Sequence, residues 1–369
     1  MTTMMIRYAL VGIAFVVSLA CGMAVTPMVV DYCKRRKLFD KPDARKVHHT
    51  PVPRLGGVCF LPCMGVAFAM AALSLYLLSN RQVHVSLMSI GLIVGAMIVY
   101  AVGLLDDLIE VRATRKMMVQ IVSACCLPLS GLYFTNLYGL LGIWEIPWYV
   151  GVPLTVLFVV AVDNAMNLID GIDGLCAGIS LIGLAGFAVM FAHIGVWTYT
   201  VALAGLAGVL VAYSYFNLLS KRRKIFMGDS GSLTLGYILA TCVVKLAQWL
   251  PGGSVFDEHQ MVFAMSFLTV PCLDVLRVMF TRKRMGKGLF EPDRSHLHHR
   301  LIDAGYTQHQ ALGLILLLDL DLVALNVVMA WKDVPPTLIL VVDMLVFALF
   351  CYGVHRRHVT RMKREAEGR

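Results

Sequence analysis

Three short acidic segments lie at the ends of long apolar runs, and their residue types fit phosphate chemistry. They read Gly-Leu-Leu-Asp-Asp-Leu at 103–108, Asn-Ala-Met-Asn-Leu-Ile-Asp-Gly-Ile-Asp-Gly at 164–174 and Phe-Met-Gly-Asp-Ser-Gly-Ser at 226–232. A carboxylate at mid-bilayer costs ~2.5–3.5 kcal/mol on insertion scales, so such residues are rare unless they function. The carboxylates are Asp106, Asp107, Asp163, Asp170, Asp173 and Asp229. Their mutual repulsion at one membrane face requires a cation, which predicts a metal and phosphate chemistry.

The first segment pairs two adjacent carboxylates with nearby cations. Asp106 and Asp107 diverge by about 100° on a helix, so one can meet a metal or nucleophile while the other orients a neighbour. The alternative is that the pair only marks the end of a membrane span. Arg112, Arg115 and Lys116 follow on the same loop or helix start and suit an anionic phosphate.

The second segment combines amides, carboxylates and glycines. Asn167 and Asp170 are three residues apart and would share a helical face. Asp173 lies between Gly171 and Gly174, two residues that let backbone N–H groups approach a phosphate closely. The alternative is a simple turn capped by an aspartate.

The third segment precedes an apolar run. Asp229 could act only as a helix N-cap. The same geometry, however, brings free helix N–H groups, serine hydroxyls and a carboxylate together, which suits a metal-bound diphosphate. Asn217 ends the preceding apolar run and faces the same loop.

A histidine-rich segment, Asp-Arg-Ser-His-Leu-His-His at 293–299, allows three interpretations. A structural zinc site lacks an obvious fourth ligand, and a plain solvated loop needs no ligand at all. We favour a loop that binds substrate, with Arg294 for an anion or amide and with His296, His298 and His299 for hydroxyls and phosphate.

The elements that must position these residues are membrane spans. The chain has 369 residues, of which 59% are hydrophobic and 15% charged, with a mean hydropathy of +0.75, and this excludes a soluble globular protein. Apolar runs long enough to cross a bilayer occur at 8–33, 56–78, 86–105, 117–136, 148–166, 175–194, 196–217, 231–249, 260–280, 309–330 and 336–354. We therefore predict an all-α, polytopic helical bundle of about 11 transmembrane helices. Residues 1–354 would form a single transmembrane catalytic domain, followed by a basic, partly disordered tail at 355–369.

Basic residues predict the orientation. Of 32 Lys and Arg residues, 27 lie in the tail and in the loops that follow odd-numbered spans. The positive-inside rule therefore places the C-terminus in the cytoplasm and the N-terminus outside. The net charge of +9 is largely this topology signal, so no nucleic-acid partner is expected.

Five ordered motifs, spread over roughly residues 10–350, resemble the polyprenyl-phosphate N-acetylhexosamine-1-phosphate transferase family. They are the Lys-Pro-Asp-x-Arg-Lys-x-His loop that begins at 41 and ends in Gly-Gly, the Asp-Asp pair, Asn-Leu-Ile-Asp-Gly-Ile-Asp-Gly, Phe-Met-Gly-Asp-Ser-Gly-Ser, and Asp-Arg-x-His-x-His-His. Any one motif is weak, but five in order are specific. The histidine motif resembles the bacterial N-acetylglucosamine branch of the family.

The resemblance implies a reaction and a location. N-acetylglucosamine 1-phosphate would pass from UDP-N-acetylglucosamine to undecaprenyl phosphate with Mg²⁺ or Mn²⁺, releasing UMP and initiating a lipid-linked envelope glycan. Another UDP-N-acetylhexosamine is the alternative donor. The enzyme would lie in the bacterial cytoplasmic (inner) membrane, among membrane lipid, with its active site facing the cytoplasm, and a homodimer is compatible with this.

The resemblance also implies roles for individual residues. Asp229 would bind the metal, with Asn167 as a second ligand. Asp106 or Asp107 would deprotonate or position the lipid phosphate, and Lys116 would face that phosphate.

The nucleotide-sugar would be bound by residues from three of these motifs and by Asn217. Asp170 and Asp173, part of the expected catalytic set, would hold the nucleotide-sugar end. The further substrate-binding residues expected are Lys46, His48, Asn217, Arg294, His296, His298 and His299.

Two other classes of membrane protein use acidic residues. An intramembrane prenyltransferase would leave the Gly-Asp-Ser-Gly and histidine motifs unexplained. An ion-coupled transporter would use Asp319, Asp321 and Asp343, which fall inside the last two apolar runs, yet no internal repeat is evident. For these three aspartates we expect partners within the bundle and assign no role.

Overall fold

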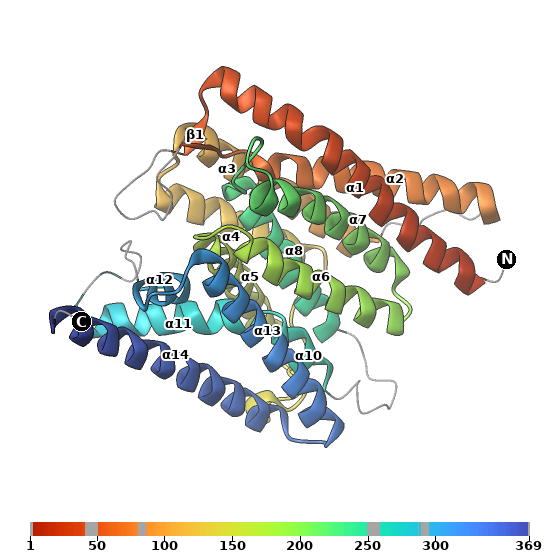
Figure 1. The fold of residues 1–369 in the computed structure, drawn as a ribbon. Coiled ribbons are helices and arrows are strands. Elements are labelled where there is room, and N and C mark those ends of the chain that lie inside the picture. Colours follow the sequence, from red (N-terminus) through yellow and green to blue (C-terminus); the bar gives the residue numbers. More distant parts are fainter. Residues whose placement is uncertain are drawn as a thin grey trace. The chain divides into compact units, whose positions relative to one another are not determined.

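The computed structural model describes residues 3–40, 51–79, 86–248, 259–286, 288 and 295–367 (Figure 1). Regular structure in these ranges is helical except for one two-residue antiparallel pair, β1 (Phe39–Asp40) with β2 (Val52–Pro53). The predicted all-α polytopic membrane class is confirmed, because the helices are long and apolar.

Nine helical segments of the described chain are long and apolar enough to span a membrane. They are α1 (Thr3–Arg36), η1 (Gly56–Cys59) with α2 (Phe60–Ser79), α3 (Leu87–Ile109), α5 (Trp148–Ile169), α6 (Leu175–His193), α7 (Trp197–Ser214) with η3 (Tyr215–Leu219), α8 (Asp229–Ala247), α13 (Gln308–Trp331) and α14 (Pro336–Ala366). The shorter helices are α4 (Ala113–Leu129), η2 (Leu140–Gly142), α10 (Gln260–Ser266), α11 (Thr269–Arg284) and α12 (Leu297–Asp303).

Two of the eleven predicted spans differ from simple helices. The 117–136 run forms α4, which ends at Leu129 and has only 17 residues. The 260–280 run is broken into α10 and α11, which are bent by 69° and would together make a tenth span. Pro271 lies in the first turn of α11, where its missing N–H costs nothing, so it favours a new helix start there. The count of eleven and the orientation stay predictions.

The basic tail is helical over residues 355–366 rather than partly disordered. Helix α14 continues from Pro336 to Ala366 without a break, so the expectation of disorder is wrong for residues 355–366. The helix continues because this stretch contains neither Pro nor Gly between Val354 and Ala366.

The chain forms two compact units, and whether both act as one catalytic domain stays a prediction. Unit 1 comprises residues 1–42, 48–132 and 180–242. In it α1 packs along α7 and α2, and α3 packs along α4. Glycines allow close contact: a Cβ on Gly208 of α7 would overlap the Phe15 carbonyl of α1. Unit 1 therefore owes its tight helix packing partly to small residues.

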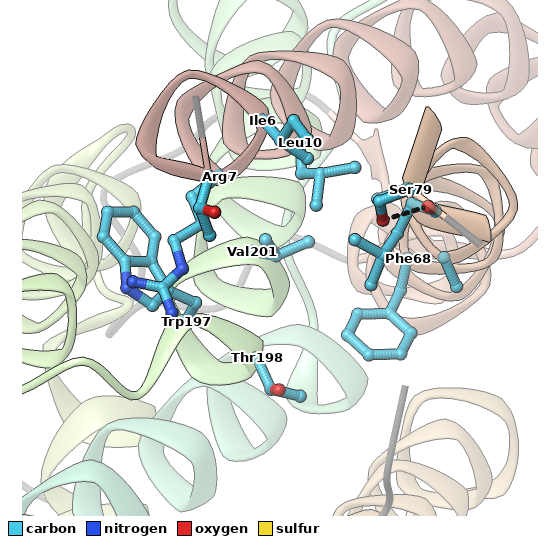
Figure 2. A pocket seen from close by; sticks show the side chains of 12 residues that line it. Ile6, Arg7, Leu10, Phe68, Ser79, Trp197, Thr198 and Val201 are labelled. Atoms are coloured by element: carbon cyan, nitrogen blue, oxygen red, sulfur yellow. Dashed lines mark hydrogen bonds between the residues drawn. The ribbon is translucent and has the colours of Figure 1, made fainter. Parts of the chain in front are cut away.

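Unit 1 also contains a pocket of about 330 Å³ between α1, α2 and α7 (Figure 2). Its wall is largely apolar, but the Arg7 guanidinium lies 5.3 Å from the ring centre of Trp197. A cation stacked on an indole at the ends of two apolar helices is typical of a membrane–water interface.

Unit 2 comprises residues 43–47, 133–179 and 243–369. Helix α5 packs on α11, and α13 packs on α10, α12 and α14. The Asn326 amide of α13 donates to Ser266 Oγ and to Asp343 Oδ2, both at 2.9 Å, so Asp343 has the expected bundle partner. Asp321 is exposed, whereas Asp319 is fully buried with no hydrogen-bond partner among the described residues. The expectation of a partner is therefore wrong for Asp319.

Candidate active site

Asp107, near the end of α3, holds the first turn of α8. Its Oδ1 accepts from the Asp229 N–H at 2.8 Å, and its Oδ2 accepts from the Ser230 N–H at 3.0 Å and the Ser230 hydroxyl at 2.7 Å. These backbone donors are among the four that the start of a helix leaves without intrahelical partners. Asp107 is only 5% exposed and both of its oxygens are engaged by the start of α8, whereas its expected catalytic role stays a prediction.

Asp106, the adjacent carboxylate, faces in a different direction. Its Oδ1 accepts from the Val111 N–H at 2.6 Å, and its Oδ2 lies 3.2 Å from Lys116 Nζ. The same ammonium contacts Asp229 Oδ2. The cluster of Asp106, Lys116 and Asp229, which we call the carboxylate–lysine cluster, thus joins the ends of α3, α4 and α8.

The charges of this cluster support one another. Burial alone would lower the pKa of the Lys116 ammonium, but the carboxylates of Asp229 and Asp106 more than offset this and raise the pKa. Lys116 therefore stays protonated at physiological pH. The three side chains remain between 14% and 24% exposed, so a ligand can reach them.

Glycines bring the first-loop motif against the start of α8. A Cβ on Gly57 would overlap the backbone of Gly231, and a Cβ on Gly103 would meet the backbone of Asp229 and Ser230. Gly228 has φ +73° and lies against the Asp107 carboxylate, so a side chain there would be strained and would also displace that carboxylate. The Gly-Gly end of the first motif is therefore a packing requirement of the site.

Backbone hydrogen bonds fix the loop that precedes α8. The Gly56 and Gly57 N–H groups donate to the Phe226 and Met227 carbonyls at 2.8 and 2.7 Å. The Asn217 amide, at the end of the preceding span, donates to the Ile225 carbonyl at 2.9 Å and is 3% exposed. The structure therefore places Asn217 at this loop, as predicted, and gives it a loop-holding contact. Its substrate contact stays a prediction.

The carboxylate–lysine cluster has donors that suit a divalent cation. Mg²⁺ prefers oxygen ligands and usually takes one or two carboxylates together with substrate phosphates. Asp106 and Asp229 offer two carboxylates that already converge on one cationic group. In the described ranges no three His, Cys, Asp or Glu side chains gather as a complete metal site. The cluster therefore fits a metal that arrives with phosphate.

The second acidic segment lies in unit 2, where α5 ends at Ile169. Asp170 follows as the C-terminal cap, its N–H 3.3 Å from the Asn167 carbonyl, so Asn167 is helical and Asp170 is just beyond the helix. Asn167, Asp170 and Asp173 are all half-buried. The predicted shared helical face is therefore not formed, because Asn167 lies on α5 whereas Asp170 and Asp173 follow its end.

Unit 2 contains its own cluster of polar side chains, which is built on Asp274 of α11. Asp274 was absent from the predicted site. Its oxygens accept from the Leu297 N–H at 3.1 and 3.2 Å, from Arg277 Nη2 at 2.7 Å and from His296 Nδ1 at 3.0 Å. Arg277 Nη2 also donates to the Ser295 carbonyl. Asp274 thus holds both the start of α12 and the ring of His296. The sequence feature that could have pointed to Asp274 is its spacing from Arg277, three residues further on in the same apolar run.

The three histidines gather around this aspartate, and we call Asp274, His296, His298 and His299 the histidine cluster. The rings of His296 and His298 are parallel with centres 6.0 Å apart, and those of His298 and His299 are 4.2 Å apart. Burial, with a contribution from the neighbouring His299, lowers the pKa of His298 to about 3, so its ring is neutral. A Cβ on Gly171 would overlap His298 Nε2, so the second acidic motif and the histidine motif meet within unit 2.

The tautomer of His296 follows from its partner. A carboxylate only accepts, so His296 Nδ1 carries the proton that it shares with Asp274. The Nε2 atoms of His296 and His298 are buried with no hydrogen-bond partner among the described residues. No zinc-like ligand group occurs there, since the described residues hold no such cluster.

Three predicted residues, Lys46, His48 and Arg294, lie outside the described residues. Of the rest, the structure brings Asp106, Lys116 and Asp229 together with Asp107 and Asn217 close by in unit 1. It brings His296, His298 and His299 against the turn that contains Asp170 in unit 2.

Comparison with known proteins places these motifs in one family. The sequence model of glycosyl transferase family 4 matches residues 89–247. A probable undecaprenyl-phosphate N-acetylglucosaminyl 1-phosphate transferase of Bacillus subtilis is 32% identical over 349 residues, covering 93% of this chain and 92% of that protein. The undecaprenyl-phosphate alpha-N-acetylglucosaminyl 1-phosphate transferases of Yersinia pestis and Escherichia coli K12 are 31% and 30% identical, covering 89% and 90% of this chain and 88% and 89% of their own lengths.

Proposed function

The chain belongs to glycosyl transferase family 4, and from that premise we propose that it transfers N-acetylglucosamine 1-phosphate from UDP-N-acetylglucosamine to undecaprenyl phosphate. It is an integral membrane phosphoglycosyltransferase. The observation that carries the proposal is the carboxylate–lysine cluster, in which one half-buried ammonium joins Asp106 and Asp229 at the end of an apolar helix. A site in this position can bind the phosphate of a lipid while the lipid tail remains in the bilayer.

In the proposed reaction a lipid-phosphate oxygen attacks the sugar-bearing phosphorus of the donor. A new P–O bond forms, the P–O bond of the diphosphate linkage breaks, and UMP leaves with that bonding pair. Both reactants are anions, so cations must offset their repulsion. Lys116 supplies one fixed positive charge at the cluster.

The two adjacent aspartates take separate roles in this proposal. Both oxygens of Asp107 are engaged by α8, so Asp107 acts by positioning Asp229. Asp106 keeps an oxygen directed at Lys116 and can accept a proton from the lipid phosphate or orient it.

A divalent cation completes the proposed site. Asp229 and Asp106 would hold Mg²⁺ or Mn²⁺, and the role of Asn167 as a ligand stays a prediction from the family resemblance. A bound metal would neutralise the diphosphate and stabilise the leaving UMP.

The histidine cluster suits the uncharged part of the donor. A buried polar atom without a partner costs about 1–3 kcal/mol, so the Nε2 atoms of His296 and His298 favour a ligand that can hydrogen-bond to them. Sugar hydroxyls and an acetamido group can supply such hydrogen bonds. Asp170 and Asp173 lie on or next to the turn that meets His298, and their contact with the nucleotide-sugar stays a prediction.

Unit 1 also offers an apolar surface for the acceptor tail. A cavity of about 440 Å³ between α2, α3, α7 and α8 is almost entirely apolar. Its α3 wall runs from Ser89 to Tyr100, and Asp106 follows on the same helix. We propose that the isoprenoid chain occupies this cavity, because a tail there is continuous with a phosphate at Asp106.

The proposed location is the bacterial cytoplasmic membrane with the site at its cytoplasmic face, where soluble UDP-sugar is available. The product would initiate a lipid-linked envelope glycan. The homodimer stays a prediction that light scattering of the detergent-solubilised protein tests.

The test is transfer of radiolabelled N-acetylglucosamine 1-phosphate to undecaprenyl phosphate by the purified chain. We expect labelled lipid and free UMP with Mg²⁺ or Mn²⁺, loss of both with EDTA, and recovery when metal is restored. If labelled lipid forms only from UDP-N-acetylgalactosamine, the proposed reaction stands but the proposed sugar is wrong. No product from any UDP-N-acetylhexosamine, with folded protein, would refute the proposal.

A further inference from the structure

Helix α14 is longer than a membrane crossing requires. Its 31 residues extend roughly 46 Å at 1.5 Å per residue, against ~30 Å of hydrocarbon. The excess lies at its basic end, where Arg356, Arg357, Arg361, Lys363 and Arg364 occur within nine residues. This end therefore lies at or beyond the headgroup level.

The basic end of α14 and the end of α12 enclose a hollow of about 760 Å³ within unit 2. Four arginines and one glutamate contribute all of its formal charge. The lining residues are Ala304, Gly305, Gly353, Arg356, Arg357, Thr360, Arg361, Arg364 and Glu365. We call this cavity the arginine hollow. With Glu365 subtracted, it keeps a clear excess of positive charge.

Two of the four arginines fix the walls of the hollow. The Arg357 guanidinium stacks 4.0 Å from the ring centre of Tyr306 and donates to its hydroxyl at 2.8 Å. Arg361 pairs with Glu365 at 2.7 Å. Gly305, with φ +92°, packs so closely on Arg361 that a Cβ would lie 2.9 Å from its Nη1. These contacts attach the end of α12 to α14.

The other two arginines face the hollow without a counter-ion. Arg356 and Arg364 form no ion pair among the described residues, and both are exposed. They lie four residues before and after Thr360, so the two guanidinium groups share one helix face. The Thr360 hydroxyl donates to the Arg356 carbonyl at 2.9 Å, so the donors left for a ligand are the guanidinium groups, which bind phosphate oxygens in bidentate fashion.

We propose that the arginine hollow binds a phosphate-bearing anion, with an anionic phospholipid headgroup and a soluble phosphate as the two possible sources of the same chemistry. A basic cavity at the end of a membrane helix is suited to lipid headgroups. Because α12 carries the histidine cluster at its start and the hollow at its end, a bound anion would also restrain α12.

The test measures lipid retention by native mass spectrometry of the full-length protein in detergent. Dioleoylphosphatidylglycerol is titrated, with dioleoylphosphatidylcholine as the zwitterionic reference and pyrophosphate as the soluble phosphate. We expect the Arg356→Gln/Arg364→Gln variant to bind phosphatidylglycerol roughly 10- to 30-fold more weakly, from about 1 kcal/mol per basic residue. The control Arg35→Gln/Arg36→Gln removes the same charge from the exposed end of α1 and should bind normally.

A variant in the opposite direction guards against misfolding. Glu365→Gln removes the negative charge of the hollow and should strengthen phosphatidylglycerol binding several-fold. In the unmodified protein, bound lipid should also slow amide hydrogen exchange at 297–305. Binding and competition by pyrophosphate alone would support the site and assign it to a soluble anion. Equal binding by all variants would overturn the proposal, and no outcome depends on transferase activity.

Discussion

The carboxylate–lysine cluster and the histidine cluster are built on the same plan but reach opposite electrostatic states. In each, a buried aspartate on one helix accepts from the backbone at the start of another helix: Asp107 of α3 holds α8, and Asp274 of α11 holds α12. In unit 1 the result is a charged group, with Lys116 between two carboxylates. In unit 2 the result is a stack of imidazoles with a neutral ring at its centre.

The difference follows from what each cluster must hold. Charged groups retain water, and the three members of the carboxylate–lysine cluster stay partly exposed. His298 is 2% exposed, and burial keeps it uncharged. A charged, accessible cluster suits phosphates and a metal, whereas the buried neutral ring of His298 suits hydroxyls and amides. Substitutions that change the charge of a side chain but keep its shape therefore test the roles of the two clusters separately.

Asp229→Asn should have the largest effect, because it removes the proposed metal ligand and a partner of Lys116. We expect kcat to fall by about 100-fold or more, the scale at which a preorganised charge contributes to a transition state. Labelled-lipid formation measures this, and added Mn²⁺ should not restore it. Asp31→Asn, an exposed carboxylate on α1, is the matched control and should retain activity. Normal turnover by Asp229→Asn would remove the metal assignment.

Asp274→Asn tests whether the histidine cluster depends on its aspartate. The change breaks a buried pair with Arg277 and frees the tautomer of His296, so we expect a stability loss of about 3–5 kcal/mol. Thermal unfolding in detergent should show a lower Tm. In the fraction that folds, the KM for the donor should rise about tenfold, on the scale of one lost hydrogen bond to a charged group. The exposed Asp321→Asn should change neither quantity, and an unchanged KM in Asp274→Asn would limit Asp274 to stability.

Asp107→Asn should be milder, because an amide oxygen can still accept from the start of α8. One of the three donors would then face the amide NH₂, at a cost of about 1–3 kcal/mol. Ser230→Ala removes only the hydroxyl bond and is the graded comparison. If Asp107 acts by positioning, the activity of the two variants should fall in proportion to their loss of Tm. A large loss of kcat at unchanged Tm would instead make Asp107 a reacting group.

The carboxylate–lysine cluster was easier to predict from the sequence than the histidine cluster, for a physical reason. Carboxylates in apolar runs are costly, so Asp106 and Asp229 stand out and invite a common partner. Which member of the Asp106–Asp107 pair reacts could not be read from adjacent residues, because it depends on the position of the start of α8. Asp274 also lies in an apolar run, but one carboxylate with a nearby arginine is typical of a simple bundle pair.

The helices were predictable from apolar length, whereas their interruptions were not. A hydropathy pattern covers 260–280 as one run, yet the chain bends between α10 and α11, and Pro271 is compatible with either a kink or a new start. The positive φ of Gly228 could likewise not be predicted from the sequence. A side chain is excluded there by the Asp107 carboxylate, which lies far away in the sequence.

A pH series should show the smallest effect and distinguishes the clusters most directly. His298 has a folded-state pKa of about 3, lowered by burial and His299, against about 6.5 when unfolded. The unfolded chain therefore binds more protons between these values. The stabilising contribution is complete above pH 6.5 and is lost as pH falls, by at most about 1.4 kcal/mol per unit.

Tm measured from pH 7 to pH 5 should decline, and His298→Gln should flatten the decline. His309→Gln, which removes an exposed histidine of α13, should leave it unchanged. An equal slope in both variants would mean that His298 is not held neutral by burial, and the contrast between the clusters would fail.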